Sequence, residues 1–342
     1  MKAIVFYQHG GPEVLKFDDV PEPKVRANQV LVRVRACALN HLDLWVRRGL
    51  PNVPIPLPHI PGSDVAGEVA KIGDEVTTVR MGQKVVLAPG VTCGKCAACL
   101  AGQDNRCRHF TNLGYMIDGG CAEFVRVPEV NCLPYPENLK WEEAAAVPLV
   151  FLTAWHMLVS RAGLQPGEDV LILGAGSGVG TAAIQIARFL GARVIATAGS
   201  DIKLAKAREL GADHFINHKT QKIREEVRRI TNKRGVDVVF EHVGIATWDE
   251  SFASLASNGR LVTCGATTGY DAKIDLRFLF SKQLSLLGSY MGKKSELQTV
   301  LKLVADGRLK PVVDRVFPLA EAAAAHAYLE AGSQFGKVVL RV

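Results

Sequence analysis

The most informative segment for the fold is Val170-Leu171-Ile172-Leu173-Gly174-Ala175-Gly176-Ser177-Gly178-Val179-Gly180. A continuous apolar run ends in a glycine-rich turn, and a helical pattern follows over 179–190. Glycines let backbone approach a pyrophosphate, and a helix N-terminus adds unpaired N–H groups and a positive dipole end. The spacing is not G-x-G-x-x-G, because Thr181 takes the last place, and an ordinary tight turn is the alternative. The position between a strand and a helix favours a phosphate-binding loop.

Strand and helix patterns alternate downstream of this loop, which is typical of a parallel sheet covered on both faces. The expected strands are 169–173, 193–197, 214–216, 236–240 and 260–264. The expected helices are 179–190, 202–210, a basic segment within 222–234, and one near 248–255. The sequence therefore predicts an α/β fold with a doubly wound parallel sheet in this half of the chain.

The first 150 residues have a different pattern, with short alternating segments separated by Gly and Pro, as in an all-β domain. Examples are 30–35, 65–72, 84–88 and 122–127. The proline-rich stretch 51–61 requires extended backbone, so we expect a surface loop beside a cleft. From about residue 290 a helix and short strands return, and this segment could pack back on the first domain.

Composition excludes several classes of function. The chain has 342 residues, 48% hydrophobic and 22% charged, which suits two globular domains. No apolar run is long enough to span a membrane, and no secretory signal pattern is present, so we expect a cytoplasmic protein. The net charge of +7 comes without a nucleic-acid motif. We therefore expect a small-molecule substrate, no nucleic-acid partner and no membrane association.

Four of the eight cysteines, Cys93, Cys96, Cys99 and Cys107, lie close together in sequence. In a cytosolic chain such a cluster is typical of metal ligands, whereas the scattered cysteines are typical of small buried apolar residues. Four thiolates make a closed tetrahedral zinc site that holds a short loop together. An iron–sulfur site lacks support in the surrounding sequence, and disulfides conflict with the compartment. We expect one structural zinc.

The residues at the end of the second strand of the α/β half help to distinguish an NAD site from an NADP site. An NAD site usually has Asp or Glu there to hold the ribose hydroxyls. This chain instead has a small, open turn with Ser200 and Lys203, which could accept a 2′-phosphate. Asp201 argues against this interpretation, because its negative charge lies close to the same turn in the sequence. Lys203 could equally be a solvated helix residue. NADPH is favoured, and NADH stays possible.

Further motifs follow one another in a fixed order. They are Pro61-Gly62-Ser63-Asp64-Val65-Ala66-Gly67-Glu68-Val69, the cysteine set, Leu152-Thr153-Ala154-Trp155, Ala198-Gly199-Ser200 and Gly211-Ala212-Asp213-His214. With the glycine-rich loop, they make the chain resemble the medium-chain dehydrogenase/reductase superfamily over essentially its whole length. The resemblance implies a GroES-like catalytic domain over 1–150 and 290–342, with a structural zinc lobe near 90–110. It also implies a Rossmann domain over 151–289 and an active site between the two.

The resemblance does not extend to the catalytic zinc of the alcohol dehydrogenases. Two positions that hold Cys and His ligands in those enzymes are occupied here by Asn40 and Ser63, with Asp64 in place of Glu. The late cysteine near 149–150 is missing, and the hydroxyl and His proton relay is replaced by Leu42 and Trp45. In these places the chain is similar to quinone oxidoreductases, which use no metal.

Four polar residues lie close to Asn40 and Ser63 in the sequence, and more than one role is open for them. A metal site of unusual composition is conceivable from nearby His and carboxylate side chains, although hydrogen bonding is the simpler role for them. These side chains are His41, Asp43, His59 and Asp64. His156 is expected to be a packed residue and not a catalytic base.

The resemblance also implies roles for single residues. The candidate catalytic residues are Asn40, Asp43 and Thr153, of which Asn40 would orient substrate or cofactor ribose and Thr153 would contact the nicotinamide. His218 stands where related reductases place a Tyr against the adenosine phosphate. The cofactor-binding set comprises Asn40, Thr153, Gly174, Gly176, Ser177, Gly178, Val179, Gly180, Ser200, Lys203, His218, Gly265, Ala266 and Ser289.

These observations favour NADPH-dependent reduction of quinones or α,β-unsaturated carbonyls without a catalytic zinc. A conjugated carbonyl that accepts hydride spreads the charge onto oxygen, where a hydrogen bond can suffice. One alternative is an alcohol or aldehyde dehydrogenase of the zinc type. Another, of a different class, is a non-catalytic NADPH-binding or redox-sensing protein. The resemblance implies a homodimer or homotetramer, paired through the sheet edge near 283–290.

Overall fold

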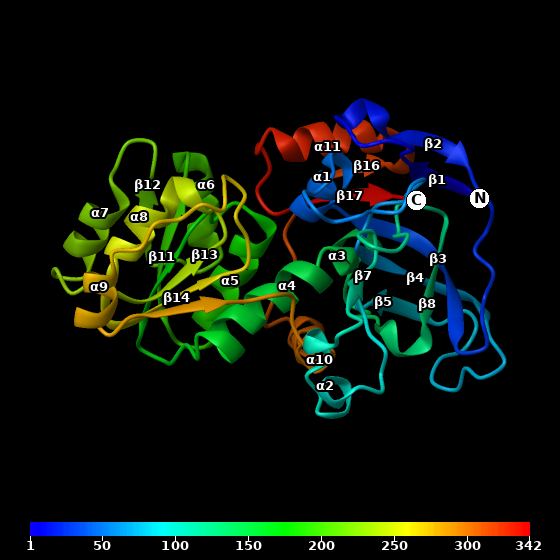
Figure 1. Ribbon diagram of the computed structural model, residues 1–342, viewed down its shortest axis with the longest axis horizontal. Helices are drawn as coiled ribbons and strands as arrows, with labels where there is room; N and C mark the ends of the chain where they lie inside the picture. The colour runs from blue at the N-terminus through cyan, green and yellow to red at the C-terminus, as the bar shows by residue number, and fades with distance from the viewer. The chain divides into compact units, whose positions relative to one another are not determined.

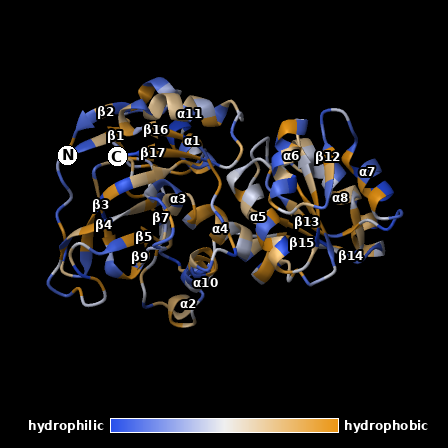
Figure 2. Ribbon diagram, turned by 180° about the vertical axis from the view of Figure 1, so that it is seen from behind, coloured by the Kyte–Doolittle hydropathy of each residue, from blue (hydrophilic) through white to orange (hydrophobic).

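The computed structural model describes residues 1–342, which divide into two compact units (Figure 1). The first unit comprises Met1–Leu149 and Lys293–Val342, and the second comprises Val150–Gly292. Hydrophobic residues concentrate on the strands inside each unit, and hydrophilic residues on the loops (Figure 2). No helix combines the length and the apolar character needed to cross a bilayer.

The second unit is built on six parallel strands in the order β12-β11-β10-β13-β14-β15. The order runs one way from β10 to β12 and the other way from β13 to β15, so right-handed crossovers put helices on both faces. The predicted doubly wound sheet is confirmed. The strands are β10 Asp169–Ile172, β11 Arg193–Ala198, β12 His214–Asn217, β13 Val236–Glu241, β14 Leu255–Thr263 and β15 Ser285–Gly288.

Four helices of the second unit follow the expected positions with shifted ends, and a fifth, α9, was not predicted from the sequence. They are α5 Gly178–Phe189, α6 Asp201–Glu209, α7 Ile223–Ile230, α8 Ile245–Ala253 and α9 Leu276–Ser281. The basic helix is shorter than its charge pattern, because Asn232 and Lys233 take φ of 51° and 67°. Ahead of β10, α4 Pro148–Trp155 passes into a π-helical turn, His156–Arg161, in which His156 is buried.

The first unit contains a seven-stranded sheet in the order β16-β17-β3-β4-β5-β9, with β8 also paired to β3. The last strand, β17, runs antiparallel to β3 and pairs Leu340 with Cys37, so the end of the chain returns to this sheet. The strands are β3 Gln29–Ala38, β4 Asp64–Ile72, β5 Lys84–Leu87, β8 Phe124–Pro128, β9 Cys132–Pro134, β16 Val313–Pro318 and β17 Lys337–Arg341.

Smaller elements complete the first unit. The two-stranded pairs are β1 Lys2–Val5 with β2 Lys16–Asp19, and β6 Gly90–Val91 with β7 Thr111–Asn112. The helices are α1 His41–Arg48, α2 Ala97–Leu100, α3 Trp141–Ala145, α10 Lys294–Ala305 and α11 Ala322–Glu330. Short 3-10 turns occupy Pro12–Val14, Asp104–Arg106, Glu129–Asn131 and Leu319–Glu321.

The proline-rich stretch 51–61 is only partly the surface loop that the sequence predicts. Residues 56–58 are exposed, but Ile55, His59 and Ile60 are buried. The N–H and carbonyl of His59 pair with the backbone of Phe6, so the end of this stretch is held beside β1. Prolines restrict the backbone to an extended form, but burial is decided by the strand that pairs with it.

Candidate functional site

A buried cluster of polar side chains lies where α1, β4 and β17 meet in the first unit. The Lys337 ammonium donates to the carbonyl of Leu39 at 2.7 Å, to Asn40 Oδ1 at 2.6 Å and to Asp64 Oδ2 at 2.9 Å. Asn40 Nδ2 donates to the same Asp64 oxygen at 2.9 Å. Asn40 is 7% exposed, Lys337 3% and Asp64 fully buried, so the charges face each other and not water.

Local structure explains how Asn40 and Asp64 come to this place. Asn40 has extended backbone at the start of α1, and Asp64 is the first residue of β4, which pairs with Ala38 of β3. The other carboxylate oxygen of Asp64 accepts the N–H of Leu149 at 2.7 Å and so caps the beginning of α4. The carboxylate therefore has a partner on each oxygen.

Asp43 holds the backbone around the cluster. Its two oxygens accept the N–H of Asn40 at 2.7 Å and the N–H of Gly62 at 3.0 Å. Burial raises the pKa of Asp43 from 3.8 to about 6, although both backbone donors oppose this shift. The structure thus gives Asp43 a backbone-binding role between α1 and the Gly62 turn.

The structure assigns hydrogen-bonding partners to the two positions where zinc alcohol dehydrogenases have ligands. Ser63 is buried and its hydroxyl donates to the carbonyl of Leu113 at 2.7 Å, while Asn40 is bound to Lys337 and Asp64. The ring of His59 packs edge-on against Phe6, with ring centroids 5.4 Å apart.

Lys337 is the member of this cluster that no sequence motif indicates. It stands 297 residues from Asn40 and begins an apolar strand, Lys337-Val338-Val339-Leu340. The only signal in the sequence was a lysine at the start of a strand that is otherwise buried. Because a buried lysine needs acceptors, such a residue indicates a polar partner elsewhere.

The four clustered cysteines form the one group of metal-ligating side chains that the structure brings together. The ligand atoms of Cys93, Cys96, Cys99 and Cys107 all lie within 4.8 Å of one another. The Cys96–Cys99 and Cys93–Cys107 sulfur pairs are each 3.5 Å apart. A tetrahedral zinc with Zn–S bonds of about 2.3 Å separates its sulfurs by roughly 3.8 Å. The cluster therefore fits a structural zinc.

The segment around this cluster is built for such a site. Gly94 and Gly102 have φ of 71° and 67°, so they turn the chain in a conformation that other residues adopt with strain. The Cys107 sulfur accepts the N–H groups of Cys93 at 3.5 Å and of His109 at 3.3 Å, and such donors favour the thiolate that a metal needs. Asp104 accepts the N–H of Lys294 at the start of α10, and Figure 1 shows α2 and α10 side by side.

The glycine-rich loop connects β10 to α5, where the strand order of the second unit reverses. The Ser177 hydroxyl accepts the N–H of Gly180 at 2.9 Å and donates to the carbonyl of Gly174 at 2.8 Å. A Cβ at Gly180 would lie 2.3 Å from the Gly174 carbonyl oxygen, and Gly174 has φ of 57°. Both positions therefore require glycine, as expected of a backbone cradle at a helix N-terminus.

Basic side chains gather at the end of β11. The Ser200 hydroxyl accepts the N–H of Lys203 at the start of α6. A Cβ on Gly199 would lie 3.2 Å from both His218 Nε2 and Lys219 Cε, so these side chains border the turn closely. Burial, followed by the charges of Lys219 and Lys203, lowers the pKa of His218. Lys203 and Lys219 thus bring positive charge close to the turn.

Two hydroxyl groups of the second unit are buried without a hydrogen-bond partner: Thr153 Oγ1 and Ser289 Oγ. Thr153 lies on α4, and Ser289 follows β15 and donates its N–H to Thr263. Buried hydroxyls without partners are costly, so they fit a polar ligand group such as a nicotinamide carboxamide. Gly265 and Ala266 follow β14 at the same carboxyl edge of the sheet.

The expected site residues therefore fall into two sets. Asn40 and Asp43 lie together in the first unit with Asp64 and Lys337, whereas Thr153 and the cofactor-binding residues from Gly174 to Ser289 lie in the second unit. Thr153 lies on α4, and the carboxyl ends of β10, β11, β12, β14 and β15 carry the others. This edge is where doubly wound sheets bind dinucleotides.

Comparison with known proteins agrees with this architecture. The alcohol dehydrogenase GroES-like domain matches residues 26–137, and the zinc-binding dehydrogenase domain matches residues 178–306. An NAD-dependent alcohol dehydrogenase of Sulfolobus acidocaldarius is 35% identical, over 100% of both chains. A quinone oxidoreductase of Rattus norvegicus is 31% identical, over 99% of this chain and 97% of its own.

Among solved structures, an NAD-dependent alcohol dehydrogenase is 48% identical and covers 100% of both chains, with a TM-score of 0.97. The matches to both kinds of relative extend over the two units and the cysteine cluster. The chain therefore belongs to the medium-chain dehydrogenase/reductase superfamily of NAD(P)-dependent oxidoreductases, as a zinc-type, alcohol dehydrogenase-like member.

Proposed function

We propose that this protein reduces quinones or α,β-unsaturated carbonyls by hydride transfer from NADPH, without a catalytic zinc. The observation that carries the proposal is the chemistry at positions 40 and 63. An amide and a hydroxyl stand there, and both are hydrogen-bonded to other groups of the protein. Neither is a ligand that zinc favours. The similarity to a quinone oxidoreductase supports the same assignment.

A reduced nicotinamide supplies the hydride when it is bound. The N–H groups at the start of α5 bind its diphosphate, and the Ser177 hydroxyl keeps the preceding turn in shape. The hydroxyls of Thr153 and Ser289 orient the carboxamide. Asn40 contributes a fixed amide that positions a ligand group. A conjugated carbonyl spreads the incoming charge onto oxygen, so hydrogen bonds can stabilise the transition state.

The preference for NADPH rests on the basic turn after β11. Lys203 and Lys219 carry positive charge close to the turn at Gly199 and Ser200, where a 2′-phosphate would add negative charge, and the neutral ring of His218 borders the same turn. Lys203→Ala should weaken NADPH binding about tenfold and leave NADH binding nearly unchanged, as measured by fluorescence titration. Lys206→Ala, on the exposed side of the same helix, is the control. Equal losses for both cofactors would make Lys203 structural.

A second candidate function is NAD-dependent alcohol oxidation. It is favoured by the alcohol dehydrogenases among the relatives, including the solved structure at 48% identity. Alcohol oxidation is assisted by a metal that lowers the pKa of the bound alcohol. The two candidates therefore differ in their response to a chelator and in their substrates.

The deciding experiment measures turnover of a quinone and enone panel against a primary and secondary alcohol panel. Reduction should persist in a chelator that leaves the cysteine-bound zinc in place, and alcohol oxidation should be slow at neutral pH. Asn40→Ala should lower reductase kcat/KM by roughly 5- to 100-fold, because a positioning hydrogen bond is lost. Asn28→Ala, at an exposed position outside the cluster, is the matched control. Rapid alcohol oxidation that vanishes on chelation would refute the proposal.

A further inference from the structure

Lys337 and Asp64 determine which way the amide of Asn40 faces. An ammonium group only donates hydrogen bonds and a carboxylate only accepts them. Lys337 Nζ lies 2.6 Å from one polar atom of the Asn40 side chain, and Asp64 Oδ2 lies 2.9 Å from the other. The atom beside Lys337 must therefore be the oxygen, and the atom beside Asp64 must be the nitrogen.

The nitrogen of this amide has no hydrogen left for a ligand. One Nδ2 hydrogen is donated to Asp64, and the other points toward the carbonyl of Ala38, with the heavy atoms 3.5 Å apart. The oxygen accepts one hydrogen bond, from Lys337, and keeps a second lone pair. Asn40 can thus accept from a ligand but cannot donate to one.

All three hydrogens of the Lys337 ammonium are committed as well. They go to Leu39, Asn40 and Asp64. Lys337 is 3% exposed and Asp64 is fully buried, whereas Asn40 keeps 7% of its surface exposed. Of these three charged or polar side chains, Asn40 therefore retains the largest exposed share of its surface.

We propose that Lys337 is a positioning residue that fixes Asn40 as a hydrogen-bond acceptor, so that the ligand group recognised at Asn40 is a hydroxyl. This inference rests on the proposed function in one respect, namely that Asn40 contacts a ligand. The hydroxyl belongs either to the substrate or product, as in a hydroquinone, or to the ribose of the cofactor. A carbonyl oxygen is not recognised by Asn40, because no donor faces it.

The experiment measures dissociation constants, without turnover, for two matched pairs of ligands. The first pair is hydroquinone and 1,4-dimethoxybenzene. The second is NADPH and an analogue whose nicotinamide-ribose hydroxyls are methylated. In the unmodified protein one pair should favour its hydroxyl member by about five- to tenfold. The pair that discriminates identifies the source of the hydroxyl.

The variant that tests the role of Lys337 is Lys337→Met, which removes the donor and keeps the length of the side chain. The preference for the hydroxyl member should fall below twofold, and Lys337→Arg, which still donates, should restore it. A purely structural role would weaken both members of a pair equally. If Lys337→Met does not fold, Lys337→Met with Asp64→Asn leaves no unpaired charge and still removes the constraint on the amide.

Two results would overturn the inference. One is the absence of discrimination in both pairs for the unmodified protein, and the other is unchanged discrimination in a folded Lys337 variant. Because binding is measured without turnover, a protein that selects hydroxyl ligands but reduces no quinone contradicts only the proposed function. A quinone reductase without hydroxyl selection contradicts only the inference.

Discussion

Asp43 is a single residue whose ionisation should be visible in the stability of the protein. Burial raises its pKa from 3.8 to about 6, so folding favours the protonated form. Its contribution to the free energy of unfolding is therefore fully present below pH 3.8 and is lost as pH rises to about 6. The loss amounts to about 3 kcal/mol, at 1.36 kcal/mol for each pKa unit.

Asp43→Asn should remove this dependence. The stability of the unmodified protein relative to the variant should decline between pH 4 and pH 6.5 and then level off, because the carboxyl is ionised in both states above that range. Chemical denaturation at several pH values measures this difference. A constant difference across the range would mean that Asp43 is ionised throughout and that its burial is offset by the two backbone donors.

Arg47 and Arg48 both pair with the carboxylate of Glu330, so substitutions at the two arginines compare a buried with an exposed ion pair. Arg47 is fully buried and donates to the carbonyl of Gly10 at 3.1 Å and to Glu330 at 3.2 Å, whereas the side chain of Arg48 is 50% exposed and pairs with the same Glu330. Arg47→Leu should lower the free energy of unfolding by about 1–3 kcal/mol, because the Gly10 carbonyl and the buried His326 ring lose a hydrogen-bond partner while Glu330 keeps Arg48.

Arg48→Leu is the matched control, and an exposed ion pair of this kind contributes at most about 1 kcal/mol. Urea unfolding of both variants measures the contrast. Similar losses of the free energy of unfolding in the two variants would show that the buried guanidinium contributes no more than the exposed one. In that case the packing of the Gly10 loop against α1 and α11 does not depend on Arg47.

At the scale of elements, the cysteine segment between β6 and β7 has little core of its own. Of its four ligands only Cys107 is buried, and α2 has no buried residue. A bound metal should therefore supply much of its stability. Cys96→Ser should lower the zinc content below one per chain and lower Tm, with a smaller effect on the chemical step.

Elemental analysis and thermal unfolding measure these effects, with Cys132→Ser as the control because Cys132 lies outside the cluster. Two tightly bound zinc ions per chain in the unmodified protein would contradict a single structural site. The contact between Asp104 and the start of α10 suggests that loosening of the segment also affects this helix.

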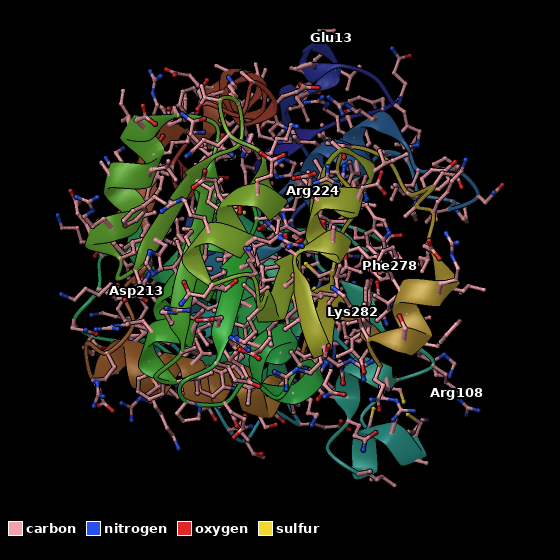
Figure 3. All side chains as sticks on the ribbon, turned by 90° about the vertical axis from the view of Figure 1, so that its left-hand side faces the viewer. Glu13, Arg108, Asp213, Arg224, Phe278 and Lys282 are labelled. Atoms are coloured by element: carbon pink, nitrogen blue, oxygen red, sulfur yellow. The ribbon has the colours of Figure 1, made fainter.

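At the scale of the whole molecule, the sheet of the second unit ends at β15, whose outer edge has no strand partner. Exposed apolar side chains lie on the adjacent helix α9, including Phe278 at 53% and Phe280 at 71% exposure; Figure 3 labels Phe278 and Lys282. An open strand edge beside apolar surface favours pairing with a second chain. We therefore predict a homodimer or a homotetramer.

Light scattering at micromolar concentration tests this prediction. Phe280→Glu should shift the equilibrium toward monomer, because a charge would be buried in the interface. Glu225→Gln on α7, an exposed position away from β15, is the control. A monomer at all concentrations in the unmodified protein would refute the assembly.

Features that depend on local pattern could be predicted from the amino-acid sequence. Apolar strand patterns that alternate with helical patterns predicted the doubly wound sheet, because the spacing of apolar residues reflects which side chains of each element are buried. The spacing of Cys93, Cys96, Cys99 and Cys107 predicted one metal cluster, because ligands close in sequence need only a short turn to converge. The order of the motifs also identified the family correctly.

The contacts between residues far apart in the chain follow from the three-dimensional fold and could not be predicted from local pattern. The sequence motifs indicate Asn40 and Asp43 but not Lys337, which reaches Asn40 through the pairing of β17 with β3. Likewise, His59 is buried because Phe6 pairs with it, and Lys219 joins His218 beside Gly199 through the packing of β12 on β11. Strand pairing brings together residues whose separation along the chain carries no local signal, and the direction of the Asn40 amide follows from two such partners.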